Sequence, residues 1–474
     1  MTRMALCITN TMSGKKEPFL PLTPGTVNMY VCGVTVYDQC HIGHARALLT
    51  FDIIHRYLRF LGFDCRFVRN FTDVDDKIIN RANEEGIAPE ALAQRYIDAF
   101  HRDAAALGLA EPAVEPRATE HIDGMVALIA ALMERGHAYA VAGDVYFAVE
   151  SFPEYGRLSR RSLDEMTAGA RVEVDDRKRH PMDFALWKAS KEGEPFWDSP
   201  WGRGRPGWHI ECSVMSTRYL GQPFDIHGGG QDLVFPHHEN EIAQSECATG
   251  EPFARYWIHN GFVQLAKEKM SKSVGNILSI KEVLERFDPV ALRLYMLTTH
   301  YRNPIEFSEE GLAEAQRTVA RLYETASRAE RLIGPSPDGA ADSGPLDDFR
   351  REMDDDFNTP RALAVVFEEL RAVNRLLDEG HTRALDGKRN ALRAMTGALG
   401  LLQSPPERFL EERRLSGLTR LALSEDEIRR MIEERNAARR AKDWGQADGI
   451  RDSLKEQGIL LRDGPSGTTW ELAE

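Results

Sequence analysis

Apolar and polar residues in the first part of the chain follow one another in a way that predicts a strand, a helix and a second strand. Residues 26–38 (TVNMYVCGVTVYD) are rich in Val, Tyr and Thr, which is typical of a strand followed by a turn. Residues 41–62 space their apolar side chains like one face of a helix and end at Gly62, a residue suited to a helix C-terminus. Residues 65–73 predict another strand. This succession favours a parallel βαβ unit and a doubly wound, Rossmann-like α/β fold.

The pattern changes character several times along the 474 residues. A charged, irregular stretch with short strands interrupts the α/β pattern, which then returns, and helices follow until a Pro-rich break. A chain of this length exceeds one hydrophobic core, so we expect several domains. The expected regions are the first half of the α/β domain at 1–135, an insertion at 136–205, the second half at 206–265, a connecting region at 266–315, a helical bundle at 316–404 and a small α+β unit at 405–474.

Two local signals add detail to this division. Asp288 and Pro289 precede an apolar helical pattern, so Asp288 is expected to cap a helix whose first turn holds the proline. Residues 334–345 (GPSPDGAADSGP) predict an exposed loop.

Composition narrows the class of protein. The chain is 42% hydrophobic and 28% charged, and its longest apolar stretch, Met125–Met133, is too short to cross a bilayer. The first residues lack the pattern of a signal peptide, and the six scattered cysteines predict a reduced, cytoplasmic protein in which a cysteine is a ligand, a nucleophile or part of a core. A net charge of −14 argues against indiscriminate nucleic-acid binding but allows local basic patches.

One segment, FPHHENEIAQSE at 235–246, raises the question of a metal site. Pro236 suits the first turn of a helix, and His237 and Glu241 would then lie one turn apart on the same face. Such a pair can chelate an ion, although a histidine and a glutamate on a solvated helix are the commoner case.

Two cysteines can complete the site. Cys32 ends the first predicted strand and Cys212 lies in WHIECSVMS, beside the start of a strand or helix. Strand ends of an open α/β sheet converge on one crevice. If both cysteines meet His237 and Glu241 there, the four form a Cys₂HisGlu site suited to Zn²⁺. Taken singly, each cysteine is equally well explained as a small buried apolar residue.

Two short motifs indicate nucleotide binding. HIGH at 41–44 stands at a helix N-terminus, where His41 and His44 can donate hydrogen bonds to phosphate and Gly43 allows a flat base to approach. KMSKS at 269–273 is a polar stretch in which Lys269 and Lys272 can neutralise a polyphosphate.

Together these motifs carry a resemblance to a known family. The chain resembles the class I aminoacyl-tRNA synthetases and, among them, the cysteinyl-tRNA synthetases. The matching segments cover nearly the whole chain: YVCGVTVYDQCHIGHAR, FVRNFTDVDDKI, GWHIECS, FDIHGGGQDLVFPHHENEIAQSE, EKMSKSVGN, DPVALRLYML and ARRAKDWGQADGIRDSLKEQGILLRDGPSGTTW. The departures are Lys267, where a small residue is more usual, and the generic loop at 334–345.

The resemblance implies a function. It implies ATP-dependent ligation of L-cysteine to its tRNA through a cysteinyl-adenylate, with one Zn²⁺ per chain selecting the substrate thiolate over serine and Mg²⁺ accompanying ATP. It also implies a stem-contact region at 266–315 and anticodon binding at 405–474. We expect a cytoplasmic monomer without membrane contact.

The same resemblance assigns residues to the site, and each group has one implied role. The implied metal ligands are Cys32, Cys212, His237 and Glu241. His238 and Glu239 are left as supporting residues or as helix surface. The implied catalytic residues are His41, His44, Lys269 and Lys272. The implied ATP-binding residues are His41, Gly43, His44, Gly228, Gly229 and Lys272. The implied substrate-binding residues are Thr72, Trp208, His227 and Asp232, with Asp232 suited to an ammonium group.

Three alternatives remain open at this point. A cysteine-activating ligase that acts on an amino sugar, as in mycothiol synthesis, would share the catalytic half but would not need an anticodon reader. A zinc hydrolase would use His237 or His238 but has no use for KMSKS, and a non-catalytic RNA-binding protein needs neither zinc nor ATP motifs. A lysine motif at 76–81 (DKIINR) resembles one linked to pyridoxal phosphate and cysteine persulfide formation, although a lysine-rich turn is the preferred interpretation.

Overall fold

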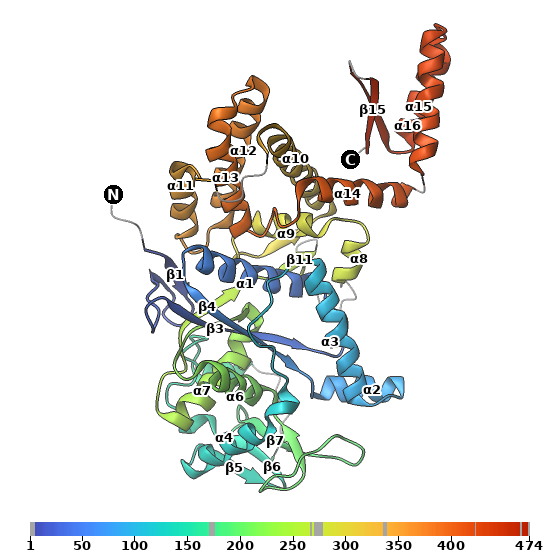
Figure 1. Cartoon of the computed structure of the whole chain (residues 1–474). Helices are drawn as coiled ribbons and strands as arrows, with labels where there is room; N and C mark the ends of the chain where they lie inside the picture. Colours follow the sequence, from blue (N-terminus) through green and yellow to red (C-terminus); the bar gives the residue numbers. More distant parts are fainter. Residues whose placement is uncertain are drawn as a thin grey trace.

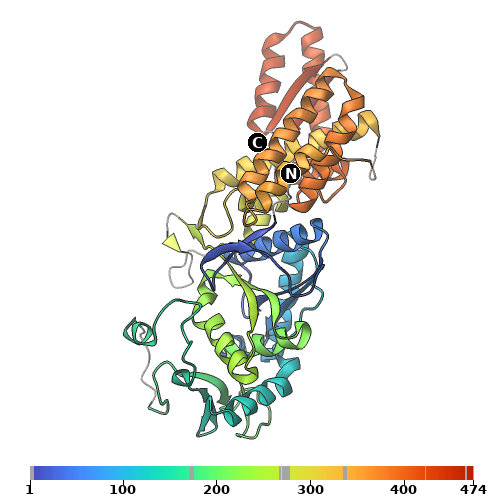
Figure 2. The same ribbon diagram turned by 90° about the vertical axis from the view of Figure 1, so that its left-hand side faces the viewer.

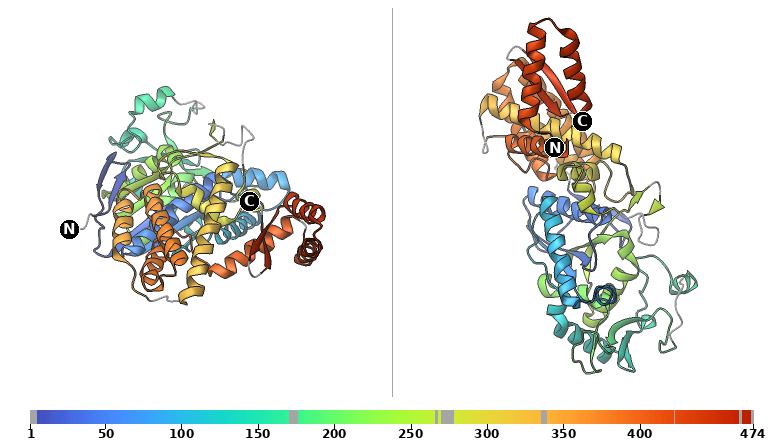
Figure 3. Two further views of the ribbon diagram at one scale, coloured as in Figure 1. Left: turned by 90° about the horizontal axis from the view of Figure 1, so that it is seen from above. Right: turned by 90° about the vertical axis from the view of Figure 1, so that its right-hand side faces the viewer.

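The computed structural model describes residues 5–169, 176–265, 268–269, 278–334, 339–421, 423–464 and 467–472. Within them an α/β domain, a helical bundle and a small C-terminal unit follow one another along an elongated molecule (Figure 1). The inserted sheet lies at one end and the C-terminal unit at the other, which Figures 2 and 3 show from other sides.

A four-stranded parallel sheet forms the centre of the α/β domain, in the order β10–β9–β3–β4. Its strands are β3 (Thr26–Thr35), β4 (Asp64–Thr72), β9 (Phe224–Gly230) and β10 (Ala254–Asn260). β4 lies on one side of β3 and β9 on the other, so the strand order reverses between β3 and β9. Open α/β sheets bind ligands at such a point, beyond the carboxyl ends of the strands. The predicted doubly wound α/β fold is confirmed.

Helices cover both faces of this sheet. One face packs against α1 (Ile42–Phe60) and α3 (Pro89–Ala106), whose apolar side chains continue into the core of the helical bundle. The other face packs against α4 (Ile122–Glu134), α6 (Trp208–Leu220) and α7 (Glu239–Thr249), which share a second core with the insertion. Because β3 is buried on both faces, its residues read as a nearly continuous apolar run.

The insertion is a separate four-stranded antiparallel sheet. Its strands are β5 (Ala138–Val141), β6 (Asp144–Phe147), β7 (Phe184–Ala189) and β8 (Gly204–Pro206). The shorter elements of the α/β domain and insertion are β1 (Cys7–Asn10), β2 (Lys15–Pro18), α2 (Asp76–Glu85) and α5 (Leu163–Gly169).

The rest of the chain is mainly helical. The connecting region contains β11 (Val263–Leu265), β12 (Glu268–Lys269), α8 (Ile280–Leu284), α9 (Pro289–Leu297) and β13 (Ile305–Phe307). The bundle contains α10 (Glu309–Ile333), α11 (Ser343–Met353), α12 (Thr359–Glu379), α13 (Thr382–Ala398) and α14 (Pro406–Leu421). The C-terminal unit contains α15 (Glu425–Arg440), α16 (Trp444–Glu456), β14 (Ile459–Gly464) and β15 (Gly467–Leu472). The boundaries expected for the six regions stay predictions.

Three local expectations differ from the structure. Asp288 is the N-cap residue of α9, but its side chain makes no capping hydrogen bond and instead lies 3.3 Å from Arg413. The predicted loop at 334–345 overlaps α11, which already begins at Ser343, and residues 335–338 of it lie outside the described residues. Pro236 is not in the first turn of α7, which starts at Glu239 after a π-helical turn. Phe235 has extended backbone angles, as a residue before proline commonly does, so continuous helical backbone begins only after it, with the π-helical turn that leads into α7.

Candidate metal centre and nucleotide cleft

A cleft of about 350 Å³ opens where the strand order reverses. Its lining includes Cys32 at the carboxyl end of β3, His41 and His44 in the first turn of α1, Asp232 after β9, and Trp208 at the start of α6. Cys32, one of the four candidate metal ligands, and both histidines of the HIGH motif therefore line one cavity.

The two histidines of the HIGH motif are held by their own backbone. The Gly43 N–H donates to His41 Nδ1 at 3.0 Å, and the His41 N–H donates to His44 Nδ1 at 3.1 Å. The rings lie with their centroids 3.9 Å apart. A ring nitrogen that accepts a hydrogen bond carries no proton, so each neutral imidazole has its proton on Nε2. Both rings are thus prepared to donate from Nε2 near the positive end of the α1 dipole.

The backbone of this first turn also pairs with the chain that precedes α8. The Ile280 N–H donates to Cys40 O at 2.9 Å, and the Ile42 N–H donates to Leu278 O at 3.0 Å. His41 and Ser279 therefore form an antiparallel bridge.

Lys269 and Lys272 were both expected to act on phosphate. Lys269 belongs to β12, where its main chain pairs with Gln264. Lys272 lies outside the described residues, so its assignment remains a prediction.

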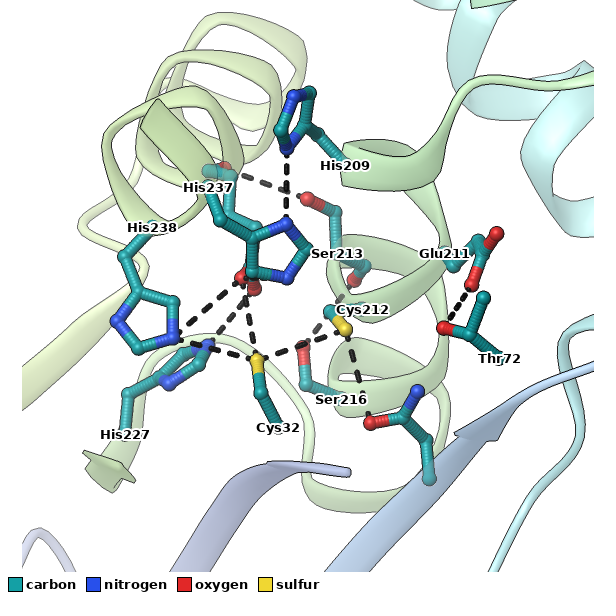
Figure 4. A network of polar contacts seen from close by, with 12 residues as sticks. Cys32, Thr72, His209, Glu211, Cys212, Ser213, Ser216, His227, His237 and His238 are labelled. Atoms are coloured by element: carbon teal, nitrogen blue, oxygen red, sulfur yellow. Dashed lines mark hydrogen bonds and ion pairs between the residues drawn. The ribbon is translucent and has the colours of Figure 1, made fainter. Parts of the chain in front are cut away.

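Four possible metal ligands converge beside the cleft. Cys32 Sγ lies 3.6 Å from Cys212 Sγ and 3.4 Å from Glu241 Oε1, and His237 Nε2 lies 3.1 Å from the same oxygen. Figure 4 shows the cysteines and His237 pointing toward one another. A tetrahedral zinc ion with bonds of about 2.0–2.3 Å holds its ligand atoms about 3.3–3.8 Å apart. The spacings of 3.4 and 3.6 Å fall in this range, that of 3.1 Å lies just below it, and all four atoms lie within 4.8 Å of one another, so the donor set can hold a metal.

A second set of four, Cys32, His227, His238 and Glu241, also lies within ligand distance. His238 Nε2 is 3.3 Å from Cys32 Sγ, and His227 Nε2 is 2.8 Å from Glu241 Oε2. We favour the first set because it uses two thiols, the partly buried Cys32 and the buried Cys212, and thiolates are ligands that zinc prefers. His227 then contacts the carboxylate of Glu241, and His238 contacts the sulfur of Cys32, without either being a metal ligand.

Burial shifts the protonation of the cluster toward neutral forms. It raises the pKa of the Cys32 thiol well above its usual value, and the neighbouring Cys212 and Glu241 raise it further. Burial likewise raises the pKa of Cys212 and lowers the pKa of His237 well below its usual value. A divalent cation would oppose the first effect by stabilising thiolates, and it would use the neutral imidazole directly.

A further histidine orients His237. The Nδ1 atoms of His209 and His237 lie 2.9 Å apart, and Figure 4 shows the two rings meeting edge to edge. Burial lowers the pKa of His209 to about 3, so His209 is a neutral ring that can accept the Nδ1 proton of His237. This leaves Nε2 of His237 as the lone-pair nitrogen facing Glu241, which is the arrangement a metal-binding histidine needs.

Of the expected substrate residues, two line the cleft. Asp232 is part of the lining, and Trp208 stacks on His237 with ring centroids 4.2 Å apart. Thr72 and His227 are not part of the lining: the Thr72 hydroxyl donates to Glu211 Oε2 at 2.6 Å, and His227 is fully buried.

The glycines expected at the nucleotide pack against side chains instead. A Cβ at Gly228 would lie 2.2 Å from the ring of Phe51, and a Cβ at Gly229 would lie 2.9 Å from the ring of His238. Gly228 and Gly229 therefore allow side chains to pack closely on β9.

Sequence reasoning missed several residues around the centre. His238 and Glu239 were left as supporting residues or helix surface, and the surface interpretation is wrong because both are fully buried. Glu239 accepts hydrogen bonds from the N–H groups of Gly156, Leu158 and Ser159, so a loop of the insertion covers this end of α7. Backbone partners leave no signal in the sequence, although two adjacent histidines after a strand could have marked His238.

Comparison with known proteins covers most of the chain. Residues 18–317 match the model of the tRNA synthetases class I (C) catalytic domain, residues 348–403 match the DALR domain, and residues 424–470 match the cysteinyl-tRNA ligase anticodon binding domain. No helix in the described ranges has the length and apolarity that a membrane span requires.

Relatives and solved structures agree with these matches. A cysteine–tRNA ligase of Geobacter sulfurreducens is 56% identical, covering 99% of this chain and 100% of that one, and one of Thioalkalivibrio sulfidiphilus is 55% identical over 98% and 99%. The Mycobacterium tuberculosis methionyl-tRNA synthetase in complex with methionyl-adenylate shares the fold, with a TM-score of 0.58, 18% identity, and coverage of 85% and 94%. The LeuRS of Agrobacterium radiobacter K84, solved with tRNA and LeuAMS, gives a TM-score of 0.60 at 13% identity, with coverage of 83% and 86%. The chain belongs to the cysteine–tRNA ligase family of class I aminoacyl-tRNA synthetases.

Proposed function

We propose that this chain ligates L-cysteine to its tRNA in an ATP-dependent reaction through a cysteinyl-adenylate. The observation that carries the proposal is the single cleft whose lining contains Cys32 of the Cys₂HisGlu cluster and both histidines of the HIGH motif. A substrate held by its side chain at the first group can present its carboxylate toward a nucleotide held at the second.

The cluster supports a resident Zn²⁺ held by Cys32, Cys212, His237 and Glu241. When bound there, zinc stabilises a thiolate far better than an alcohol, which is the chemistry that distinguishes cysteine from serine. An apolar pocket would separate such near-isosteres by only about 1–3 kcal/mol. The insertion then needs no editing role, which agrees with its contacts to α7.

The amino-acid pocket is built by this chain's own side chains. Trp208 forms a wall over His237, and Asp232 supplies a carboxylate for the substrate ammonium group. Thr72 and His227 do not line the cleft but hold its neighbours Glu211 and Glu241 in place through hydrogen bonds.

The first step needs alignment more than a base, because the attacking carboxylate is already anionic. A carboxylate oxygen attacks the α-phosphorus of ATP, the bond to the bridging oxygen breaks, and pyrophosphate leaves. His41 and His44 donate from Nε2 to the phosphates, and Lys269 and Lys272 neutralise the developing charge, with Mg²⁺ on the nucleotide. In the second step a hydroxyl of the terminal adenosine of tRNA attacks the activated carbonyl, and AMP leaves.

The acceptor is tRNA rather than an amino sugar. The match of residues 424–470 to an anticodon binding domain supports this choice, and the amino-sugar alternative is not favoured. We further propose a monomer that works in the cytoplasm, where its six free thiols stay reduced.

The test is ATP–pyrophosphate exchange with purified protein, with and without a strong zinc chelator. We expect exchange to depend on cysteine, to be absent with serine, and to fall when the metal is removed. Exchange that proceeds equally well without cysteine would contradict cysteine as the substrate. Charging of tRNA in a separate assay distinguishes the tRNA acceptor from an amino sugar.

A further inference from the structure

We propose that Asn70, a residue outside the metal ligands, is a positioning residue that aims Cys32 into the centre by closing a bulge in β3. The proposal rests on the proposed metal site and deepens it, because it identifies what holds the strand-borne ligand in place. Three observations support it: the strand register, the phase of the side chains, and the contacts of the Asn70 amide.

The register between β3 and β4 shifts at Cys32. Val31 pairs with Arg69, whereas Val34 pairs with Phe71. Two residues of β3, Cys32 and Gly33, therefore lie opposite the single residue Asn70. This is a β-bulge, which leaves part of the ladder unpaired and redirects side chains locally.

The side chains change phase at the same place. Met29 and Val31 belong to the core shared with α1, and Tyr30 and Cys32 belong to the core shared with α6 and α7. Strict alternation would put residue 34 on the α6 side, yet Val34 packs with the α1 core. Cys32 thus faces the metal site in phase with Tyr30, and the bulge that begins at Cys32 turns the following residues to the nucleotide side.

Asn70 closes the bulge with its side chain. Its Oδ1 accepts the Gly33 N–H at 2.9 Å and lies 3.7 Å from Cys212 Sγ, and the residue is 1% exposed. One amide oxygen therefore contacts the residue next to one ligand and the sulfur of the other. Figure 4 shows these two cysteines, from strand and helix, facing each other.

Gly33 is part of the same device. A Cβ at this position would lie 1.6 Å from the carbonyl oxygen of Asn70. Only glycine lets the two strands stay close enough for the side chain of Asn70 to reach the bulged N–H. Without that acceptor the N–H loses its partner in a largely buried place, and the bulge loses its preferred register.

The experiment measures zinc affinity in full-length protein by competition with a chromophoric chelator, and records the absorption of the cobalt(II)-substituted protein. Asn70→Ala removes the acceptor, and we expect about 10–100-fold weaker metal affinity, as for other residues that orient metal ligands. Asn70→Asp keeps an oxygen for the Gly33 N–H, so its affinity and cobalt spectrum should stay near those of the wild type. In exchange assays the KM for cysteine should rise in Asn70→Ala, with the KM for ATP unchanged.

Asn10→Ala is the matched control. Asn10 is 4% exposed and its Oδ1 also accepts backbone N–H groups, from Met12 and Trp257, but it contacts none of the four ligands. It should lose thermal stability without losing zinc affinity. If Asn70→Ala behaves like Asn10→Ala, or if Asn70→Asp loses as much affinity as Asn70→Ala, the positioning role is overturned while the metal site stands. A wild-type protein that binds no zinc contradicts the metal site itself.

Discussion

Two buried polar clusters lie on opposite faces of the same sheet and differ in how their charge is balanced. The metal centre combines two thiols and a carboxylate with neutral imidazoles. On the other face, Asp52 of α1 lies 2.5 Å from Arg293 of α9 and 2.8 Å from Arg56. The second cluster contains its own cations, whereas the first is arranged for one that must come from solution.

This difference separates a structural cluster from a ligand site. Arg293 also donates to Leu107 O and Gly108 O at 3.0 Å, so its hydrogen-bonding capacity is used inside the protein. Although burial alone would raise the pKa of Asp52, the adjacent Arg293 and Arg56 hold it below its usual value. In the metal centre, burial instead drives the thiol pKa upward, because no arginine or lysine takes that place among the four ligands.

The largest effect is expected from breaking the self-balanced cluster. Arg293→Met removes the fully buried cation next to Asp52 and leaves the partly exposed Arg56 as its ion partner. Removal of one partner of a buried pair costs about 3–5 kcal/mol, and the remaining Arg56 places the expected loss toward the lower end of that range. Urea unfolding should show this loss in the free energy of unfolding. The control is Arg286→Met, which breaks the exposed pair with Glu309 and should shift the midpoint very little. If Arg293→Met lost no more stability than Arg286→Met, the proposed difference between the two clusters would be wrong.

Replacing a ligand of the metal centre is expected to affect folding less than Arg293→Met does, and to weaken zinc binding specifically. Structural zinc sites gain roughly 10–16 kcal/mol from about four ligands, so Cys212→Ser should weaken zinc binding by about 2.5–4 kcal/mol, or ~10²–10³-fold. Zinc per chain after dialysis against a weak chelator measures it. Cys247→Ser is the matched control, since Cys247 is also buried and lies on α7 beyond Glu241. Equal zinc retention in both variants would sink the assignment of Cys212.

The smallest expected effect is the pH dependence of the destabilisation caused by Arg293→Met, which tests whether the ion pair of Asp52 is its cause. The pKa of Asp52 is depressed in the folded state, so its ion pair contributes stability above the unfolded pKa of about 3.9 and loses it as pH falls further. The destabilisation caused by Arg293→Met should therefore shrink as pH is lowered below about 4, because a protonated carboxyl needs no cation. Urea titrations of both proteins at several pH values on either side of this point measure the difference. A destabilisation that stays constant as pH falls below about 4 would place its origin in packing alone.

The helical spacing of His237 and Glu241 and the place of Cys32 at the end of a predicted strand suggested possible ligands, but the full set of four came from the resemblance to the synthetase family. The structure brings these residues together with Cys212. Sequence reasoning could not anticipate the role of Glu239, whose partners are three backbone N–H groups from a loop some 80 residues earlier in the chain. Asp288 shows the same limit: a good capping residue by type, it contacts Arg413 because α14 packs beside it. Contacts between distant segments, rather than local patterns, account for what was missed.

The carbonyl oxygen of Asn70 lies so close to Gly33 that few mutations of this codon should be tolerated. In a saturation library selected for growth, position 33 should tolerate as few replacements as the ligand cysteines, although it carries no reactive group. A survey of tolerated codons would thus mark a residue whose only contribution is the absence of a side chain.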